Sequence, residues 1–232
     1  PLWQSAMKGI GIAVVGLLLA AAALLAQREV IGNWLLVIIS GASFLLIYWR
    51  KVDAAWVILG AAHRLGGSHK PHNSLYVINP EGRIVDRYDK RFCTDGDLKH
   101  YSPGDHFVTF DVNGVRCGLL ICFDIRFPEM IRNMVKQGMK IMFVPAQFPN
   151  PRKEHWLNLL KTRAIENQIY VIGANRIGKA TDELNFFGNS VIIDPYGDTL
   201  ANGYEKEGVI SEYVDLDFLD AYRKSFPVLN WL

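Results

Sequence analysis

The sequence predicts an α/β domain with a mixed β-sheet, preceded by two apolar helices. The first observation behind this prediction is uneven charge: of 25 basic and 23 acidic side chains, only six fall within residues 1–60. The second is a pair of uncharged stretches, residues 9–26 and 31–49. The third is that later strand-helix-strand patterns mix with hairpins, which is typical of an α/β fold with a mixed sheet. We therefore divide the chain into residues 1–52, a helical hairpin, and residues 53–232, an α/β domain.

The two apolar stretches are long enough to cross a lipid bilayer. At about 1.5 Å rise per residue each reaches roughly 27 to 29 Å, close to the ~30 Å thickness of the hydrocarbon layer. Lys8 precedes the first stretch, and Arg50 with Lys51 follows the second, which places both flanks on the cytoplasmic side. We predict a membrane protein held in the bilayer through residues 9–49, with its α/β domain in the cytoplasm.

Two other interpretations of the apolar segment stay open. A signal peptide would leave residues 31–49 unexplained, and a buried helix pair in a soluble fold would normally show a polar face. If the segment is not a native part of this chain, we expect the domain to be cytoplasmic without an anchor.

The first half of the domain is predicted from short apolar runs between turn residues. Asn79-Pro80-Glu81-Gly82 has the composition of a turn and joins two such runs into a hairpin. Gly138 ends the first helical pattern. The elements expected here are strands at 54–59, 75–78, 84–88 and 115–122 and a helix at 128–137.

The second half continues the alternation of strands and helices. Apolar residues at helical spacing predict a helix at 153–168, and Asp194-Pro195-Tyr196-Gly197 predicts a second hairpin turn. The expected elements are strands at 139–145 and 169–174, hairpin strands at 190–193 and 199–201, a strand at 209–214 and a helix at 218–225.

Charge and cysteine content exclude several functions. Beyond residue 60 the charges balance and form no basic stripe, which argues against nucleic acid as a partner. Cys93, Cys117 and Cys122 are an odd number without metal-type spacing, so we expect no disulfide framework, no metal and no cofactor. One of the three is available for chemistry.

Cys122 stands where a predicted buried strand runs into a turn and then a helix. A thiolate there is placed to attack, and the backbone N–H of Phe123 is placed to stabilise the oxyanion that forms. The alternative is a core cysteine, since free cysteine is among the most buried residue types. Cys117, inside the same strand, is assigned to the core.

The segment 122–129, Cys-Phe-Asp-Ile-Arg-Phe-Pro-Glu, resembles the cysteine signature of the nitrilase (carbon–nitrogen hydrolase) superfamily. Further matches follow in order, and the resemblance spans residues 57–231 and is closest to omega-amidases and carbamoyl-amidases. The matching segments are Tyr88-Asp89-Lys90, Ser102-Pro103-Gly104-Asp105, His155-Trp156, Arg163-Ala164-Ile165-Glu166-Asn167, Ala174-Asn175-Arg176, Asp194-Pro195-Tyr196-Gly197-Asp198 and Arg223-Lys224-Ser225-Phe226-Pro227.

The resemblance implies a nitrilase-like α-β-β-α sandwich that commonly dimerises, and a Glu-Lys-Cys triad. Cys122 would be the nucleophile and Lys90 would stabilise the tetrahedral oxyanion. A nearby lysine would also lower the pKa of the thiol. Asp97 stands where the family has a second glutamate and is expected to orient Lys90.

The general-base glutamate of that triad has no match. The family supplies it before the lysine, and here the only glutamate before Glu81 is Glu29, in the apolar region. We therefore expect a domain that is incomplete at its N-terminus and impaired in proton transfer.

The function implied is hydrolysis of non-peptide C–N bonds in small linear amides through a Cys122 acyl-enzyme, by a homodimer. The alternatives are a membrane-bound N-acyltransferase of the same superfamily and a non-catalytic membrane or scaffold relative. Phe123 and Phe148 either line the pocket mouth or belong to the core. Arg126 and Arg176 are candidate readers of a substrate carboxylate, but structural ion pairs are the favoured interpretation of both; the candidate partners are Asp124, Glu129 and Glu166.

Overall fold

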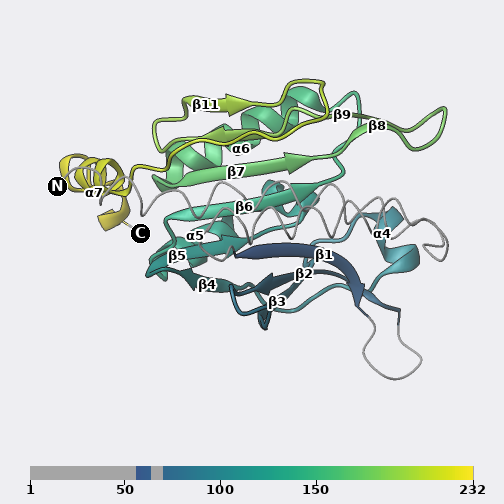
Figure 1. Ribbon diagram of the computed structural model, residues 1–232, viewed down its shortest axis with the longest axis horizontal. Helices are drawn as coiled ribbons and strands as arrows, with labels where there is room; N and C mark the ends of the chain where they lie inside the picture. The colour runs from purple at the N-terminus through teal and green to yellow at the C-terminus, as the bar shows by residue number, and fades with distance from the viewer. Residues whose placement is uncertain (1–55, 64–69, 232) are drawn as a thin grey trace, which may run out of the picture.

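The computed structural model describes residues 56–63 and 70–231 of the chain (Figure 1). The hairpin predicted for residues 9–49 lies outside the described residues. Within the described part, no helix is both long enough and apolar enough to cross a membrane.

Two main sheets make up the domain. A three-stranded antiparallel sheet holds β1 (Val57–His63), β2 (His72–Ile78) and β3 (Ile84–Asp89). A six-stranded sheet has the order β11-β10-β7-β6-β5-β4 and is parallel only at β5–β6 and β6–β7. Its strands are β4 (Thr109–Val112), β5 (Val115–Leu119), β6 (Ile141–Ala146), β7 (Tyr170–Asn175), β10 (Val191–Ile193) and β11 (Thr199–Asn202), and β8 (Ile177–Lys179) pairs with β9 (Asn185–Phe187) in a separate ribbon.

Helices α5 (Pro128–Lys136) and α6 (Lys153–Asn167) cover one face of the six-stranded sheet (Figure 1). Ile141 to Val144 of β6 are all buried, as expected for a parallel strand covered on both faces. Gly173 of β7 lets α6 approach closely, since a Cβ there would lie 2.6 Å from Leu160 and 2.8 Å from Trp156. This packing confirms the predicted α/β class with a mixed sheet.

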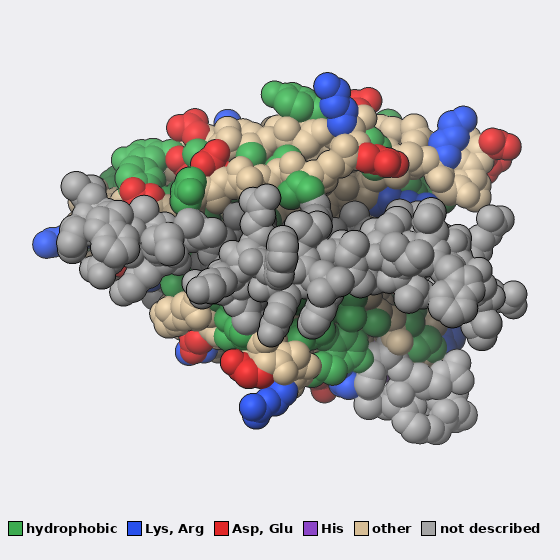
Figure 2. Space-filling model, viewed as in Figure 1, with side chains coloured by type: hydrophobic (Ala, Val, Ile, Leu, Met, Phe, Trp, Pro, Cys, Tyr) green, Lys and Arg blue, Asp and Glu red, His purple; other side chains and the backbone are tan. Residues whose placement is uncertain are grey.

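Helix α7 (Leu216–Ser225) closes one end of the domain and is followed by the short helix η3 (Val228–Trp231). Leu219 is fully buried, and the Arg223 guanidinium donates to the carbonyls of Gln168 and Met139. Tyr196 and Tyr222 stack with ring centroids 4.2 Å apart, and hydrophobic side chains reach the surface at this end (Figure 2).

Two predicted strands are wrong in part or whole. Residues 209–214 form no strand, because the segment is paired with no other described strand, and Val209 and Tyr213 are exposed. The strand predicted at 115–122 ends at Leu119, and Cys122 has a φ of 50°, which a β-strand does not allow. Beyond the ribbon β8–β9, the sequence also missed β4 and α4 (Asp95–His100), which are too short for a periodic pattern.

Candidate active site

Cys122 opens the short helix η2 (Cys122–Arg126), directly beyond the carboxyl end of β5. Its φ of 50° lies in the left-handed region, which costs a non-glycine residue roughly 1 kcal/mol or more. The turn is held by backbone bonds from Asp124 N–H to Ile121 (3.1 Å) and from Phe127 N–H to Asp124 (3.0 Å). Local strain at a thiol held between strand and helix is typical of a nucleophile turn.

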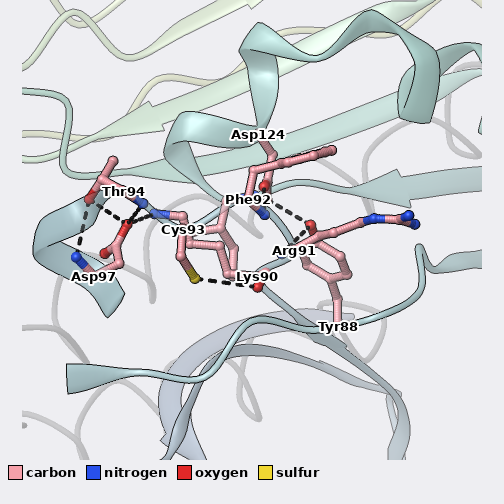
Figure 3. Close-up of polar contacts among 9 residues, drawn as sticks. Tyr88, Lys90, Arg91, Phe92, Cys93, Thr94, Asp97 and Asp124 are labelled. Atoms are coloured by element: carbon pink, nitrogen blue, oxygen red, sulfur yellow. Dashed lines mark hydrogen bonds and ion pairs between the residues drawn. The ribbon is translucent and has the colours of Figure 1, made fainter. Parts of the chain in front are cut away.

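Lys90 follows β3 and is buried, with 3% of its surface exposed. Its N–H donates to Asn73 at 2.8 Å, and its carbonyl accepts from Gly104 N–H at 2.8 Å. Its ammonium donates to Asp97 Oδ2 at 2.6 Å (Figure 3). Asp97 thus contacts Lys90 directly, and its role in orienting the lysine stays a prediction.

Asp97 is fixed by a capping box at the start of α4. Its carboxylate accepts from both the N–H and the hydroxyl of Thr94 at 2.9 Å, and its own N–H donates to Thr94 Oγ1. Burial by itself would raise the pKa of Asp97, but the hydrogen bonds from Lys90 and Thr94 hold it below its usual value. Asp97 is thus a stable anion bonded to Lys90, and it accepts a proton poorly.

The pKa of the Cys122 thiol is raised, mainly by burial. The charge of Lys90 and a hydrogen bond from the Gln147 N–H act against the rise. The expected influence of Lys90 is therefore present, but it does not bring the thiol to a low pKa. A thiol in this state is protonated at neutral pH and requires a proton acceptor to attack.

Asp124 is the residue of the site that sequence reasoning did not single out. It is fully buried, and its carboxylate accepts from the Tyr88 hydroxyl at 2.7 Å and from the N–H groups of Ile121 and Phe92 at 2.9 Å. Burial raises its pKa to about 6, although these bonds and Lys90 act in the opposite direction. Its place within the cysteine signature was the available signal.

The predicted pocket residues lie around Arg126. Its guanidinium sits over the rings of Phe123 and Phe148, 5.6 and 5.5 Å from their centroids, and Nη2 lies 3.2 Å from His155 Nδ1. Phe123 is partly exposed, whereas Phe148 is 2% exposed and packs on Trp156. Phe123 thus sits at the surface of this group and Phe148 beneath it.

The favoured ion pairs of Arg126 and Arg176 do not form among the described residues. Glu166 pairs instead with Arg163 at 2.8 Å. Arg176 donates to Gln147 at 3.2 Å and lies over the ring of Phe186. Both guanidinium groups therefore lack a carboxylate partner in this part of the chain.

In the described region no glutamate contacts Lys90 as the general base of the predicted triad would. There, no glutamate hydrogen-bonds or ion-pairs with Lys90, and the carboxylates that act on the Cys122 thiol are Asp97 and Asp124. Glu29 lies outside the described residues.

No group of three or more His, Cys, Asp or Glu side chains in the described part could hold a metal ion.

Lys90 follows β3 of the three-stranded sheet and Cys122 follows β5 of the six-stranded sheet, and the family is shown by comparison with known proteins. Residues 53–224 match the family model "Carbon-nitrogen hydrolase". The chain belongs to this family.

Curated relatives and solved structures extend the comparison. A 2-oxoglutaramate amidase of Bacillus subtilis is 39% identical over 161 residues, which are 68% of this chain and 62% of the relative. An omega-amidase of Yersinia enterocolitica is 34% identical over 189 residues, 80% and 72% of the two chains. The structure of a CN-hydrolase superfamily protein from Xanthomonas campestris, with an arsenic adduct in its active site, has a TM-score of 0.72 at 27% identity and covers 77% of this chain and 69% of its own. The chain thus spans less than two thirds of the Bacillus protein, and these relatives lend no support to the membrane acyltransferase alternative.

Proposed function

We propose that the chain hydrolyses the C–N bond of small linear amides through a thioester on Cys122. The observation that carries this proposal is the buried Lys90 ammonium, held by Asp97 and acting electrostatically on a thiol at a strained turn. A non-catalytic relative would have no use for a buried lysine oriented in this way. The amidase names of the relatives support the same reaction class.

The proposed reaction has two halves. The sulfur of Cys122 adds to the amide carbon, and the oxyanion that forms is stabilised by the Lys90 ammonium and the backbone N–H of Phe123. The C–N bond then breaks, the amine leaves with a proton, and an acyl thioester remains. Water adds to the thioester, the C–S bond breaks, and the acid and the free thiol are released.

Proton transfer is the slow part of this scheme. The thiol starts protonated because burial raises its pKa, and Asp97 is a weak base because its own pKa is lowered. Loss of a general base typically costs about 10²- to 10⁴-fold in rate. We therefore propose that the chain acylates readily only when another group removes the thiol proton.

We propose that the amide substrate carries a carboxylate at its other end. Arg126 lies four positions after Cys122 and has no carboxylate partner among the described residues. A guanidinium reads a carboxylate through two parallel hydrogen bonds. A monoamide of a small dicarboxylic acid meets both requirements, and the 2-oxoglutaramate amidase name of the Bacillus relative points to that class.

Ammonia release from such monoamides, measured on the full chain, tests the reaction. We expect turnover that Cys122→Ala abolishes and Cys117→Ala retains, with an acyl adduct on Cys122 seen by mass spectrometry. Arg126→Met should raise KM for the monoamide and leave a neutral amide of equal length unaffected. Equal rates for Cys122→Ala and the unchanged chain would overturn the proposal.

Three further proposals rest on the sequence and the family. They are that the chain forms a homodimer, that residues 9–49 attach it to a bilayer, and that the α/β domain is cytoplasmic. If residues 9–49 are not a native part of the chain, the domain is cytoplasmic without a membrane anchor. Light scattering of the full chain in detergent tests the first. Carbonate extraction of membranes tests the second, and recovery of the intact chain in the supernatant would contradict it.

A further inference from the structure

The Asp124 carboxylate lies between the two segments that carry the proposed catalytic pair. One segment follows β3 of the three-stranded sheet, and the other follows β5 of the six-stranded sheet. Figure 3 shows the Asp124 side chain pointing toward the segment that carries Tyr88, Lys90 and Phe92. Asp124 is fully buried, so water does not replace its partners.

Its hydrogen bonds flank both reacting residues. Tyr88 and Phe92, two positions to either side of Lys90, donate to the carboxylate from a hydroxyl and a backbone N–H. Ile121, directly before Cys122, donates its N–H to the same group. The Tyr88 hydroxyl also accepts from Arg91 N–H at 3.3 Å. One carboxylate therefore joins the Tyr88 side chain and the Phe92 backbone, on either side of the lysine, to the backbone before the thiol.

The ionised carboxylate accepts from all three donors at once. Oδ1 accepts from Phe92 N–H, and Oδ2 accepts from Ile121 N–H and the Tyr88 hydroxyl. An ionised carboxylate is an acceptor at every lone pair, whereas a protonated one must present an O–H. The two backbone N–H groups cannot accept that proton, but the Tyr88 hydroxyl can turn to do so. Protonation therefore reverses the Tyr88 bond and leaves the other two without the charge that strengthens them.

We infer, on the basis of the proposed function, that ionised Asp124 is a positioning residue that sets the distance and orientation between Lys90 and Cys122. It touches neither substrate nor the reacting atoms. It fixes the position of one segment relative to the other. A displacement of about 1 Å between the groups that they carry costs on the order of 10²-fold in rate.

Protonation of Asp124 should therefore limit turnover on the acid side. Burial raises the pKa of Asp124 to about 6, so the ionised form decreases below that pH. The titratable and charged groups around it are Tyr88, Lys90, Arg91, Cys93 and Cys122. The pKa values of Tyr88, Cys93 and Cys122 are all raised, mainly by burial, so none of these three ionises near pH 6.

The test compares Asp124→Asn with Tyr88→Phe, which removes the hydroxyl that bonds to Asp124 and Arg91 but keeps the carboxylate. Asp194→Asn is the matched control, since Asp194 is also buried and accepts two backbone N–H groups, from Tyr196 and Asp198, at the β10–β11 turn. Two readouts are measured on the full chain, namely the alkylation rate of Cys122 by iodoacetamide and the pH profile of monoamide turnover.

We expect Asp124→Asn to lower kcat about 10²-fold with little change in KM, and to slow Cys122 alkylation at neutral pH about tenfold. Tyr88→Phe should give smaller changes of the same sign, and Asp194→Asn none. The direction of the change in alkylation rate distinguishes positioning from a simple charge effect, because the Asp124 charge raises the pKa of the thiol. If Asp124 acted only through its charge, its removal would speed alkylation.

Faster or unchanged alkylation in Asp124→Asn overturns the inference. If Asp124→Asn does not fold, Tyr88→Phe provides the test. A wild-type rate of Cys122 alkylation in Tyr88→Phe would also overturn the inference. Absence of monoamide turnover in the unchanged chain would contradict the proposed function alone, since alkylation still reports the position of Lys90 relative to Cys122.

Discussion

At the scale of single residues, the thiol of Cys122 depends on its neighbours for any reactivity. Burial raises its pKa, and the groups that oppose this rise are Lys90 and the Gln147 N–H. The same lysine is itself buried and bonded to Asp97. A buried cation whose partner is fixed by a helix cap cannot move far from the thiol, so its charge acts at a constant place.

Lys90→Met should slow alkylation of Cys122 at neutral pH by about tenfold or more, because each unit added to the pKa of the thiol removes about nine tenths of the thiolate. The unpaired Asp97 charge would act in the same direction. Lys140→Met is the control, since Lys140 forms a surface ion pair with Asp220. Equal alkylation rates in the two variants would show that Lys90 does not act on the thiol.

Asp97→Asn should lower kcat roughly 10- to 100-fold, because a misplaced lysine stabilises the oxyanion less well. The asparagine oxygen still accepts from Thr94, so the helix cap survives. Asp95→Asn makes the same charge change in the first turn of α4, at an exposed position. Steady-state kinetics compare the two, and similar losses would assign the effect to the charge of α4 rather than to the contact with Lys90.

At the scale of elements, the segment after β3 is held by a close approach of Gly104. The Gly104 N–H donates to the carbonyl of Lys90, and a Cβ at this position would lie 2.3 Å from the carbonyl oxygen of Asp89. The glycine is required by space, and any side chain here would push against the backbone next to Lys90.

Gly104→Ala should therefore destabilise the domain by about 1–3 kcal/mol, the usual cost of overpacking, and lower kcat as well. Gly60→Ala is the control, because its Cβ would meet only Leu75, at 3.7 Å. Urea denaturation measures the first effect. An unchanged denaturation midpoint for Gly104→Ala would mean that the backbone at the end of β3 shifts to accept the added methyl group without loss of stability.

The sequence predicted the elements that carry periodic apolar patterns and missed those that do not. The β2–β3 hairpin, α5, α6 and the strands β6 and β7 were expected close to their observed bounds. The strand expected at 209–214 has the right composition, but strand formation depends on a neighbour, which composition does not report. Helix α4 is one capped turn, visible only as the Thr94–Asp97 pair.

The residues of the site likewise divide into those that the sequence predicted and those that it missed. Cys122 and Lys90 were predicted because each lies in a short recognisable motif, and Asp97 because of its spacing after Lys90. The role proposed for Asp124 was not predicted, since its partner Tyr88 lies 36 positions away on β3. The positive φ of Cys122 was equally invisible, because no local residue pattern specifies it.

At the scale of the whole molecule, a buried ionised carboxylate should reduce stability. Its pKa of about 6 exceeds the unfolded value of about 3.9, so the folded state binds more protons than the unfolded state between these values. The contribution of Asp124 to the free energy of unfolding is then greatest below about pH 4 and is lost as the pH rises through about 6.

The loss over this range is on the order of 3 kcal/mol, from about two pKa units at 1.36 kcal/mol each. We expect the free energy of unfolding of the unchanged chain, minus that of Asp124→Asn, to fall by this amount between about pH 4 and pH 7. Groups that titrate alike in both proteins cancel in the difference. Asp97, whose pKa is lowered by its hydrogen bonds, is present in both proteins and cancels in the same way. Urea denaturation at a series of pH values measures the difference, and a difference that rises with pH would mean that the hydrogen bonds to Asp124 outweigh its burial.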